Sequence, residues 1–323
     1  MIGMEIIRHI QRVGRRVREE NDVMVGESAL AYSTADYRAI HNLLASALEE
    51  EFGTELAGTL VDLGSGPGDI TARLVEMYPL IKALGIDASP EMLNMAVAHR
   101  AGCHPRVAQR LRFAYGRMPF ETPPEERADI VTSINTAHHL KAGEIWKAIK
   151  QWAKLGAPIC VIDLYRSAAT LEEASDYVEK ELPIDGSLAA EECTRSLHDR
   201  SKSDFSHSIR AAFTPQEVRA QLVAAGLGYL QVQKLGERHM VIAGRFLGEI
   251  HDGAQRYPAG ACMTRSCCNA TNLVRLSDFD FPKGWEPWNP SGIAMSGIEQ
   301  PITAEGMQGS DLPPTPSFQD QGD

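Results

Sequence analysis

The chain has 323 residues, 43% of them apolar and 23% charged, which is enough for a full hydrophobic core and one or two domains. Its formal net charge of -11 argues against a broad nucleic-acid interface, because such an interface needs a basic face. The sequence contains no run of about 18 apolar residues, and its six cysteines follow no regular framework. We therefore expect no stable membrane insertion and a reducing, cytoplasmic location.

The chain opens with a basic amphipathic pattern, "MIGMEIIRHIQRVGRR". Its apolar residues recur at roughly helical spacing among arginines, which predicts a helix with a solvated basic face. A transit peptide or a membrane-surface helix is the alternative, and Glu5 weakens the first of these. A second amphipathic helix is predicted over residues 36–52. Residues 1–55 are thus expected to form an N-terminal helical cover.

Short apolar runs then alternate with helical patterns. Five runs predict buried strands: "GTLVDLG", "IKALGID", "RLRFAYG", "ADIVTSIN" and "PICVIDLY". Helices are predicted over residues 69–78 and 142–155, and another is expected after Ser89, a natural N-cap followed by Pro90. This alternation predicts an α/β fold, a doubly wound Rossmann-like sheet with right-handed crossovers.

The second half of the chain departs from the alternation. Residues 167–213 lack strand signals and predict a helical lid inserted after the fifth strand. Thr214, Pro215 and Glu217 then form the pattern of a capping box that opens a helix. Two further runs, "YLQVQKLG" and "RHMVIAGRF", are too close together for a helical crossover, so they predict a closing antiparallel pair. The predicted α/β domain spans residues 56–247.

The tail, residues 248–323, holds eight of the 18 prolines and shows no periodicity. Its composition predicts a Pro/Gly-rich, largely disordered segment that is the candidate binding region for a protein partner. Three of its cysteines (Cys262, Cys267 and Cys268) and His251 have no recognised zinc spacing. We therefore expect no metal site.

The stretch "VDLGSGPGD", from Val61 to Asp69, is a glycine-rich turn between a strand and a helix. A dinucleotide fingerprint would place a third glycine at Asp69, but here it comes one residue early, at Gly68. Pro67 also removes a backbone donor, and two aspartates would bracket a pyrophosphate with negative charge. These departures favour a cationic ligand without phosphate. A nicotinamide-dependent oxidoreductase remains the weaker alternative.

"VDLGSGPGD", "LGIDASPEML", "ADIVTSINTAHHL" and the closing strand pair together resemble the class I S-adenosylmethionine-dependent methyltransferases over about residues 30–247. The resemblance implies S-adenosyl-L-methionine as cofactor, with the glycine-rich turn at its methionine part and Asp87 at its ribose. "YGRMPF" stands where relatives usually carry an acid near the adenine. The implied cofactor-binding residues are Asp62, Gly64, Ser65, Gly66, Gly68, Asp87, Ala88, Met92, Arg117, Met118 and Asn135.

The methyl acceptor should meet the cofactor at the carboxyl ends of the fourth and fifth strands. His138 or His139 is the candidate general base there, and Asp163 is a candidate catalytic or orienting group; for one histidine a structural role at a helix start is the alternative. Candidate acceptor contacts are Tyr32, Tyr165, Arg166 and His207. The expected function is methyl transfer to oxygen, nitrogen or carbon of a small molecule. The alternative is a non-catalytic cofactor-binding regulatory protein.

Overall fold

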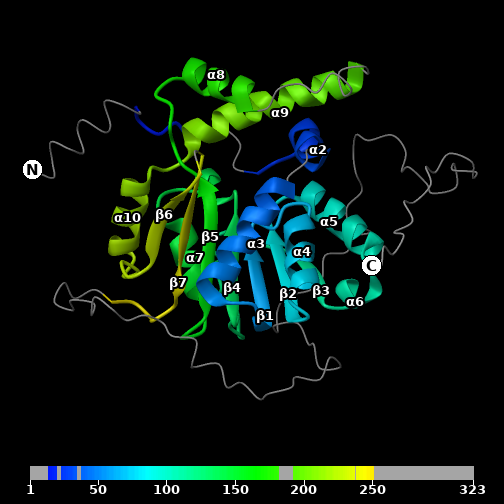
Figure 1. Cartoon of the computed structure of the whole chain (residues 1–323), viewed down its shortest axis with the longest axis vertical. Helices are drawn as coiled ribbons and strands as arrows, with labels where there is room; N and C mark the ends of the chain where they lie inside the picture. Colours follow the sequence, from blue (N-terminus) through cyan, green and yellow to red (C-terminus); the bar gives the residue numbers. More distant parts are fainter. Residues whose placement is uncertain (1–13, 20–22, 35–37, 182–191, 237, 251–323) are drawn as a thin grey trace, which may run out of the picture. The chain divides into compact units, whose positions relative to one another are not determined.

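The computed structural model describes residues 14–19, 23–34, 38–181, 192–236 and 238–250. These residues contain one seven-stranded sheet in the order β3-β2-β1-β4-β5-β7-β6, with helices on both of its faces (Figure 1). The strands are β1 Ala57–Leu63, β2 Leu80–Asp87, β3 Leu111–Tyr115, β4 Ile130–Ile134, β5 Pro158–Leu164, β6 Gln231–Leu235 and β7 His239–Arg245. The first five run parallel, whereas β7 pairs antiparallel with both β5 and β6. The predicted fold class is confirmed.

The helices begin where the sequence supplies capping groups. The described helices are α2 Gly26–Thr34, α3 Arg38–Phe52, α4 Asp69–Met77, α5 Pro90–Gly102, α6 Pro105–Ala108, the 3-10 turn η1 Ala137–His139, α7 Glu144–Trp152, α8 Leu171–Glu181, α9 Glu192–Ala211 and α10 Pro215–Ala224. The Ser89 hydroxyl accepts from the Met92 N–H and opens α5. Thr214 and Glu217 form the predicted reciprocal capping box at α10.

The strand order reverses direction beside β1, which lies between β2 and β4. The chain winds outward from β1 to β3 on one side and continues through β4 on the other. The connections at the carboxyl ends of β1 and β4 therefore separate and leave a crevice, the usual ligand position in such sheets. This topology places the glycine-rich turn, which follows β1, at the crevice.

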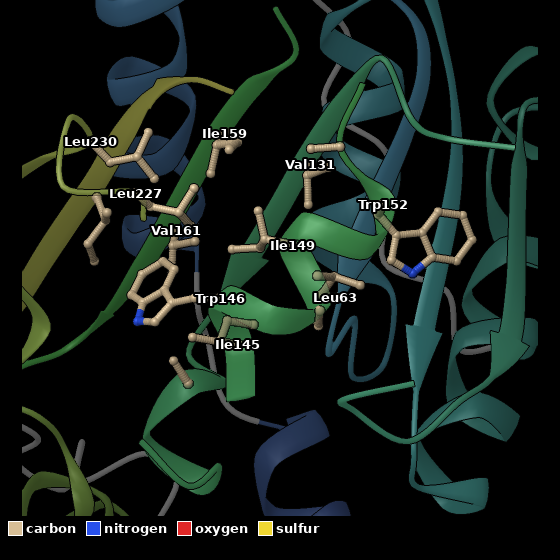
Figure 2. Packing of buried hydrophobic residues seen from close by; sticks show 14 of the residues in the cluster. Leu63, Val131, Ile145, Trp146, Ile149, Trp152, Ile159, Val161, Leu227 and Leu230 are labelled. Atoms are coloured by element: carbon tan, nitrogen blue, oxygen red, sulfur yellow. The ribbon is translucent and has the colours of Figure 1, made fainter. Parts of the chain in front are cut away.

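Packing on the two faces of the sheet holds this crevice in place. One face is covered by α7, whose Trp146 and Trp152 are buried against β4, β5 and the segment after α10 (Figure 2). The other face packs α4 and α5 against β1, β2 and β3. Each buried aromatic side chain removes a large apolar area from water, so α7 and the loop preceding it are fixed to the sheet.

The N-terminal segment differs from the prediction. Residues 14–19 are not helical, and Gly14 has a positive φ of 66°. Arg16 is half-buried instead of solvated: its guanidinium donates to the carbonyls of His138 and Leu140 at 2.6 and 2.9 Å and lies 3.9 Å from the Phe213 ring centroid. These tertiary contacts hold the arginine against η1 and Phe213, away from a solvated helix face. The rest of the predicted basic helix, residues 182–191 within the predicted lid, and the tail beyond residue 250 lie outside the described residues.

Gly68 offers a test of the turn that precedes α4. It has a φ of 77°, and an added Cβ would come within 2.3 Å of the buried Phe113 ring and 3.0 Å of Ala96. Gly68→Ala is therefore expected to lower the free energy of unfolding by about 2–4 kcal/mol, measured by chemical denaturation. Gly102→Ala is the matched control, because nothing lies within 4 Å of its Cβ position and its φ is not positive. Equal effects of the two substitutions would contradict the expectation.

Candidate active site

A pocket of about 210 Å³ lies at the carboxyl ends of β1, β2 and β4. Its lining comprises Arg18, Val23, Met24, Tyr32, Asp62, Gly64, Ser65, Gly66, Pro67, Asp69, Ile70, Asp87, Ala88, Met92, Gly116, Arg117, Met118, Ile134, Asn135, Thr136, His139, Leu140, Lys141 and Glu144. The structure thus brings to one pocket all the predicted cofactor residues except Gly68. Gly68 lies outside the pocket lining and is the N-cap residue of α4.

The glycine-rich turn passes close to the strand-four loop. Gly64 has a φ of 76°, and a Cβ there would lie 2.3 Å from the Thr136 side chain, whose hydroxyl donates to the Gly64 carbonyl at 3.1 Å. Gly66 has a φ of 53° and faces open space, with Tyr32 the nearest side chain at 4.0 Å. The turn therefore needs glycine for its conformation at both positions, and at Gly66 it leaves a bare backbone surface toward the pocket.

Asp62 is held in place from both sides. Its carboxylate accepts hydrogen bonds from the hydroxyls of Thr71 at 2.6 Å and Thr132 at 2.9 Å, and the residue is buried. Burial raises the pKa of this carboxyl, and the two hydroxyls oppose that rise. Asp62 therefore ties β1 to α4 and β4 while it contributes to the pocket wall. The sequence did not reveal its two hydroxyl partners.

Asp87 links the turn to the start of α5. Its two carboxylate oxygens accept from the backbone N–H groups of Gly66 and Ser89, each at 2.8 Å. Burial raises the pKa of the carboxyl, while these backbone donors lower it. Each oxygen keeps a further lone pair, so Asp87 can accept hydrogen bonds from a ligand in the pocket it lines.

Three buried polar atoms of the pocket wall have no hydrogen-bond partner among the described residues: the Ser65 hydroxyl, the Asn135 side-chain oxygen and His139 Nδ1, whose contact with Glu19 is an ion pair. Asn135 also has a φ of 49°, which is unusual for a residue other than glycine. An unpaired buried polar atom costs about 1–3 kcal/mol. A polar ligand that donates to Asn135 would remove that cost, so the wall suits a cofactor with amine and hydroxyl groups.

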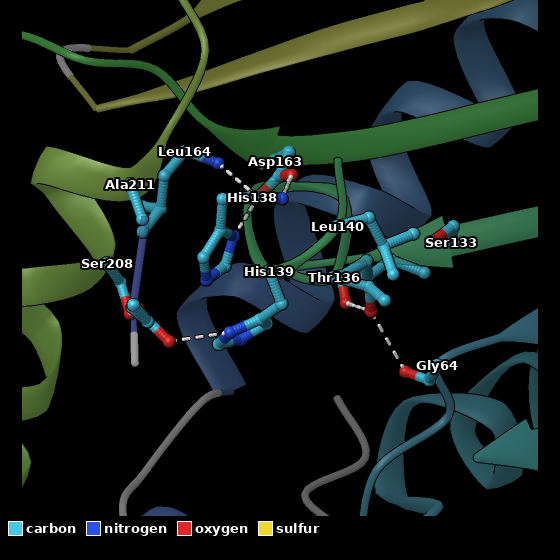
Figure 3. A network of polar contacts seen from close by, with 12 residues as sticks. Gly64, Ser133, Thr136, His138, His139, Leu140, Asp163, Leu164, Ser208 and Ala211 are labelled. Carbon is cyan, nitrogen blue, oxygen red and sulfur yellow. Dashed lines mark hydrogen bonds and ion pairs between the residues drawn. The ribbon is translucent and has the colours of Figure 1, made fainter. Parts of the chain in front are cut away.

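The two adjacent histidines of η1 have different surroundings (Figure 3). His138 is buried, and its ring Nδ1 lies 2.5 Å from a carboxylate oxygen of Asp163, whose other oxygen accepts from the His138 backbone N–H. Burial by itself would lower the pKa of His138, but the charge and hydrogen bond of Asp163 outweigh it and the pKa is raised. His139 instead lines the pocket, and its Nδ1 lies 2.7 Å from Glu19. Only His139 is placed to meet a ligand in this pocket.

Three predicted acceptor contacts do not line the pocket. Arg166 is buried and binds Glu217 at 2.7 Å and the Ala212 carbonyl, so it fastens α10 to the end of β5. Tyr165 is buried in the core with Lys234 4.4 Å from its ring centroid. His207 is exposed on α9, with its Nδ1 2.8 Å from the Ser203 carbonyl. Tyr32 does line the pocket.

Sequence reasoning missed the contribution of the N-terminal segment. Arg18, Val23 and Met24 line the pocket, and the Ser89 hydroxyl donates to the Met24 carbonyl at 2.6 Å. Nothing in the local pattern pointed to this contact, since it joins residues 65 positions apart.

Among the described residues, Glu19, His138 and His139 form a group with potential metal-ligand atoms within 4.8 Å of one another. In the part of the chain that the structure describes, no helix is long and apolar enough to cross a membrane.

Residues 60–158 match the family model described as a methyltransferase domain. Over 67 residues the chain is 42% identical to a trans-aconitate 2-methyltransferase of Azoarcus sp. (strain BH72), and over 40 residues it is 45% identical to one of Streptomyces avermitilis. These segments are 21% and 12% of this chain, and they span 24% and 15% of those relatives. A methyltransferase of Aquifex aeolicus with a solved structure is 17% identical, covers 68% of this chain and 98% of its own, and gives a TM-score of 0.46.

Residues 60–158 form a methyltransferase domain by this match. The strand order and the glycine-rich turn agree with the resemblance of this region to the class I S-adenosylmethionine-dependent methyltransferases. The matched family model is that of a methyltransferase domain, which favours the methyltransferase interpretation of the glycine-rich turn over the nicotinamide-dependent oxidoreductase.

Proposed function

We propose that the protein transfers the methyl group of S-adenosylmethionine to oxygen, nitrogen or carbon of a small-molecule acceptor. One observation carries this proposal: a single pocket joins the glycine-rich turn and Asp87 to His139, a side chain suited to proton transfer. The net charge of -11 favours a small molecule over a nucleic acid as acceptor.

Different residues of the turn and the pocket wall would contact different parts of the cofactor. Asp87 would accept from the ribose hydroxyls, Gly64 and Gly66 would admit the amino-acid part, and Met118 and Arg117 would lie along the adenine. Asn135 would accept from an amine through its unpaired oxygen. When bound, the cofactor supplies an electrophilic methyl group and a good leaving group, so the protein contributes chiefly alignment of the acceptor.

His139 would serve as general base where the acceptor loses a proton, because it is the histidine that lines the pocket. His138 and Asp163 would instead hold η1 in place, since the imidazole and carboxylate are buried against each other. The sequence offered a structural role for one of the two histidines, and we assign that role to His138.

Thermal unfolding with added ligands tests the cofactor. S-adenosylhomocysteine at 100 times its Kd is expected to stabilise the full chain by about 2.7 kcal/mol, seen as a raised Tm, whereas NAD at the same concentration leaves the Tm unchanged. Stabilisation by NAD alone would contradict the proposal.

Transfer of labelled methyl from S-adenosylmethionine then tests the activity. A panel of small carboxylic acids, alcohols, phenols and amines is offered, beginning with trans-aconitate because of the two curated relatives. We expect incorporation of label into at least one acceptor. Tight cofactor binding without label transfer to any acceptor would favour a non-catalytic, cofactor-binding regulatory protein.

A further inference from the structure

We propose that Glu19, delivered by the N-terminal segment, is the positioning residue that fixes His139 for proton transfer. This inference deepens the proposed function and rests on it. Glu19 Oε2 lies 2.7 Å from His139 Nδ1, and Glu19 Oε1 accepts from the Ser208 hydroxyl at 2.7 Å. The carboxylate thus joins three segments that are far apart in the sequence: residues 14–19, η1 and α9.

The contact is partly shielded from solvent, which makes it stronger than a surface ion pair. The Glu19 side chain is 16% exposed and that of His139 is 14% exposed. Burial by itself raises the pKa of Glu19, but hydrogen bonding and charge from His139 outweigh it and lower the pKa to about 2. Glu19 is therefore a carboxylate near neutral pH and accepts a hydrogen bond without donating one.

A carboxylate at Nδ1 selects one form of the neutral ring. With a carboxylate oxygen 2.7 Å away, Nδ1 is the nitrogen that keeps the hydrogen in the neutral ring, so Nε2 keeps its lone pair. His139 lines the pocket, so Nε2 is the nitrogen available to an acceptor. When bound, the cofactor would supply an electrophilic methyl group to the acceptor atom, with the sulfur as leaving group, and His139 would take the proton that the acceptor loses. That proton passes to Nε2, and Glu19 stabilises the resulting imidazolium.

Arg16 holds the segment that presents Glu19. Its guanidinium donates to the His138 and Leu140 carbonyls on either side of His139, and its side chain stacks on Phe213. Val17 adds a backbone hydrogen bond to the Arg210 carbonyl at 3.1 Å. Residues 16 and 17 are therefore fixed to η1 and α9 immediately before Glu19. The contacts of Arg16 and Val17 therefore determine where the Glu19 carboxylate lies.

A metal ion bound by Glu19, His138 and His139 is the competing interpretation of this group. Ligand atoms around tetrahedral zinc, with bonds of about 2.1 Å, lie about 3.4 Å apart. The Glu19–His139 distance of 2.7 Å is that of a direct ion pair and leaves no place for an ion between the two atoms. The guanidinium of Arg16, bound to the neighbouring carbonyls, also opposes a second cation.

Nitrogen NMR of histidine-labelled full-length protein with S-adenosylhomocysteine tests the proposal without an acceptor. In the neutral ring, wild-type His139 is expected to be almost entirely the Nδ1–H tautomer. Glu19→Met, which keeps the length and removes both oxygens, should give a mixture of tautomers. Glu27→Met is the matched control, because Glu27 is exposed on α2. If Glu19→Met does not fold, Glu19→Gln, which keeps the shape but removes the charge, should still make the ratio less one-sided.

An unchanged tautomer ratio in the folded variant would overturn the role of Glu19. So would one equivalent of Zn²⁺ bound by the wild type and lost in Glu19→Met, which would identify a metal site. For an acceptor found with the labelled donor, Glu19→Met should lower kcat about 10²-fold and leave KM within about threefold. A merely structural contact would change Tm and KM and leave the tautomer unaltered. Failure of S-adenosylhomocysteine to bind the wild type would refute the proposed function and not this inference alone.

Discussion

Asp87→Ala is expected to weaken S-adenosylhomocysteine binding by about 10²- to 10⁴-fold, measured by calorimetry on the purified full chain. The carboxylate is proposed to accept both ribose hydroxyls, and a hydrogen bond to a charged group contributes about 1.5–3 kcal/mol. The loss also frees the N–H groups of Gly66 and Ser89, which Asp87 now holds at 2.8 Å, so the turn loses its preset shape. Both effects act in the same direction.

Two comparisons separate the site from the fold. Asp87→Asn keeps the size and one acceptor oxygen, so its affinity should lie between those of the wild type and Asp87→Ala. Glu91→Ala removes a carboxyl from the first turn of α5, outside the pocket lining, and should leave the affinity within about threefold. Circular dichroism of Asp87→Ala should match that of the wild type. Unchanged affinity in a folded Asp87→Ala protein would remove Asp87 from the proposed site.

Asp163→Ala is expected to lower the free energy of unfolding by about 3–5 kcal/mol, the usual cost of breaking a buried ion pair. Asp163 is 1% exposed and accepts three hydrogen bonds, from the His138 ring, the His138 backbone N–H and the Leu164 backbone N–H. The truncation leaves these donors buried without an acceptor. Asp204→Ala, which removes a partly exposed pairing with Arg200 one helical turn away, should cost less than about 1 kcal/mol.

The effect of Asp163→Ala should depend on pH. Because the pKa of His138 is raised in the folded state, its protonated form stabilises the fold. That contribution is complete below the unfolded value of about 6.5 and is lost as the pH rises through the higher folded value. The difference in unfolding free energy between wild type and Asp163→Ala should therefore be larger at pH 6 than at pH 9. A difference that grows with pH would contradict the proposed charge state of the pair.

The sequence predicted the order of strands and helices because their signals are local. Ser89 and Thr214 open α5 and α10 as their cap chemistry requires, and the buried apolar runs became β1 to β5. The antiparallel end of the sheet followed from the short spacing of the last two strands. Gly64 and Gly66 reached the pocket because a turn after a parallel strand can open only toward the carboxyl edge of the sheet.

Tertiary structure alone decided the roles of the side chains at that edge. His138 and His139 are adjacent in sequence and chemically identical, yet one meets Asp163 in the core and the other meets Glu19 at the pocket. Arg16 belongs to a basic helical pattern in the sequence, but in the structure it is not helical and contacts the carbonyls of His138 and Leu140 and the ring of Phe213. The local sequence pattern determines which backbone conformation most residues adopt. The partners of a charged or polar side chain depend on segments that only the folded chain brings within hydrogen-bond distance, and burial makes those partners decisive.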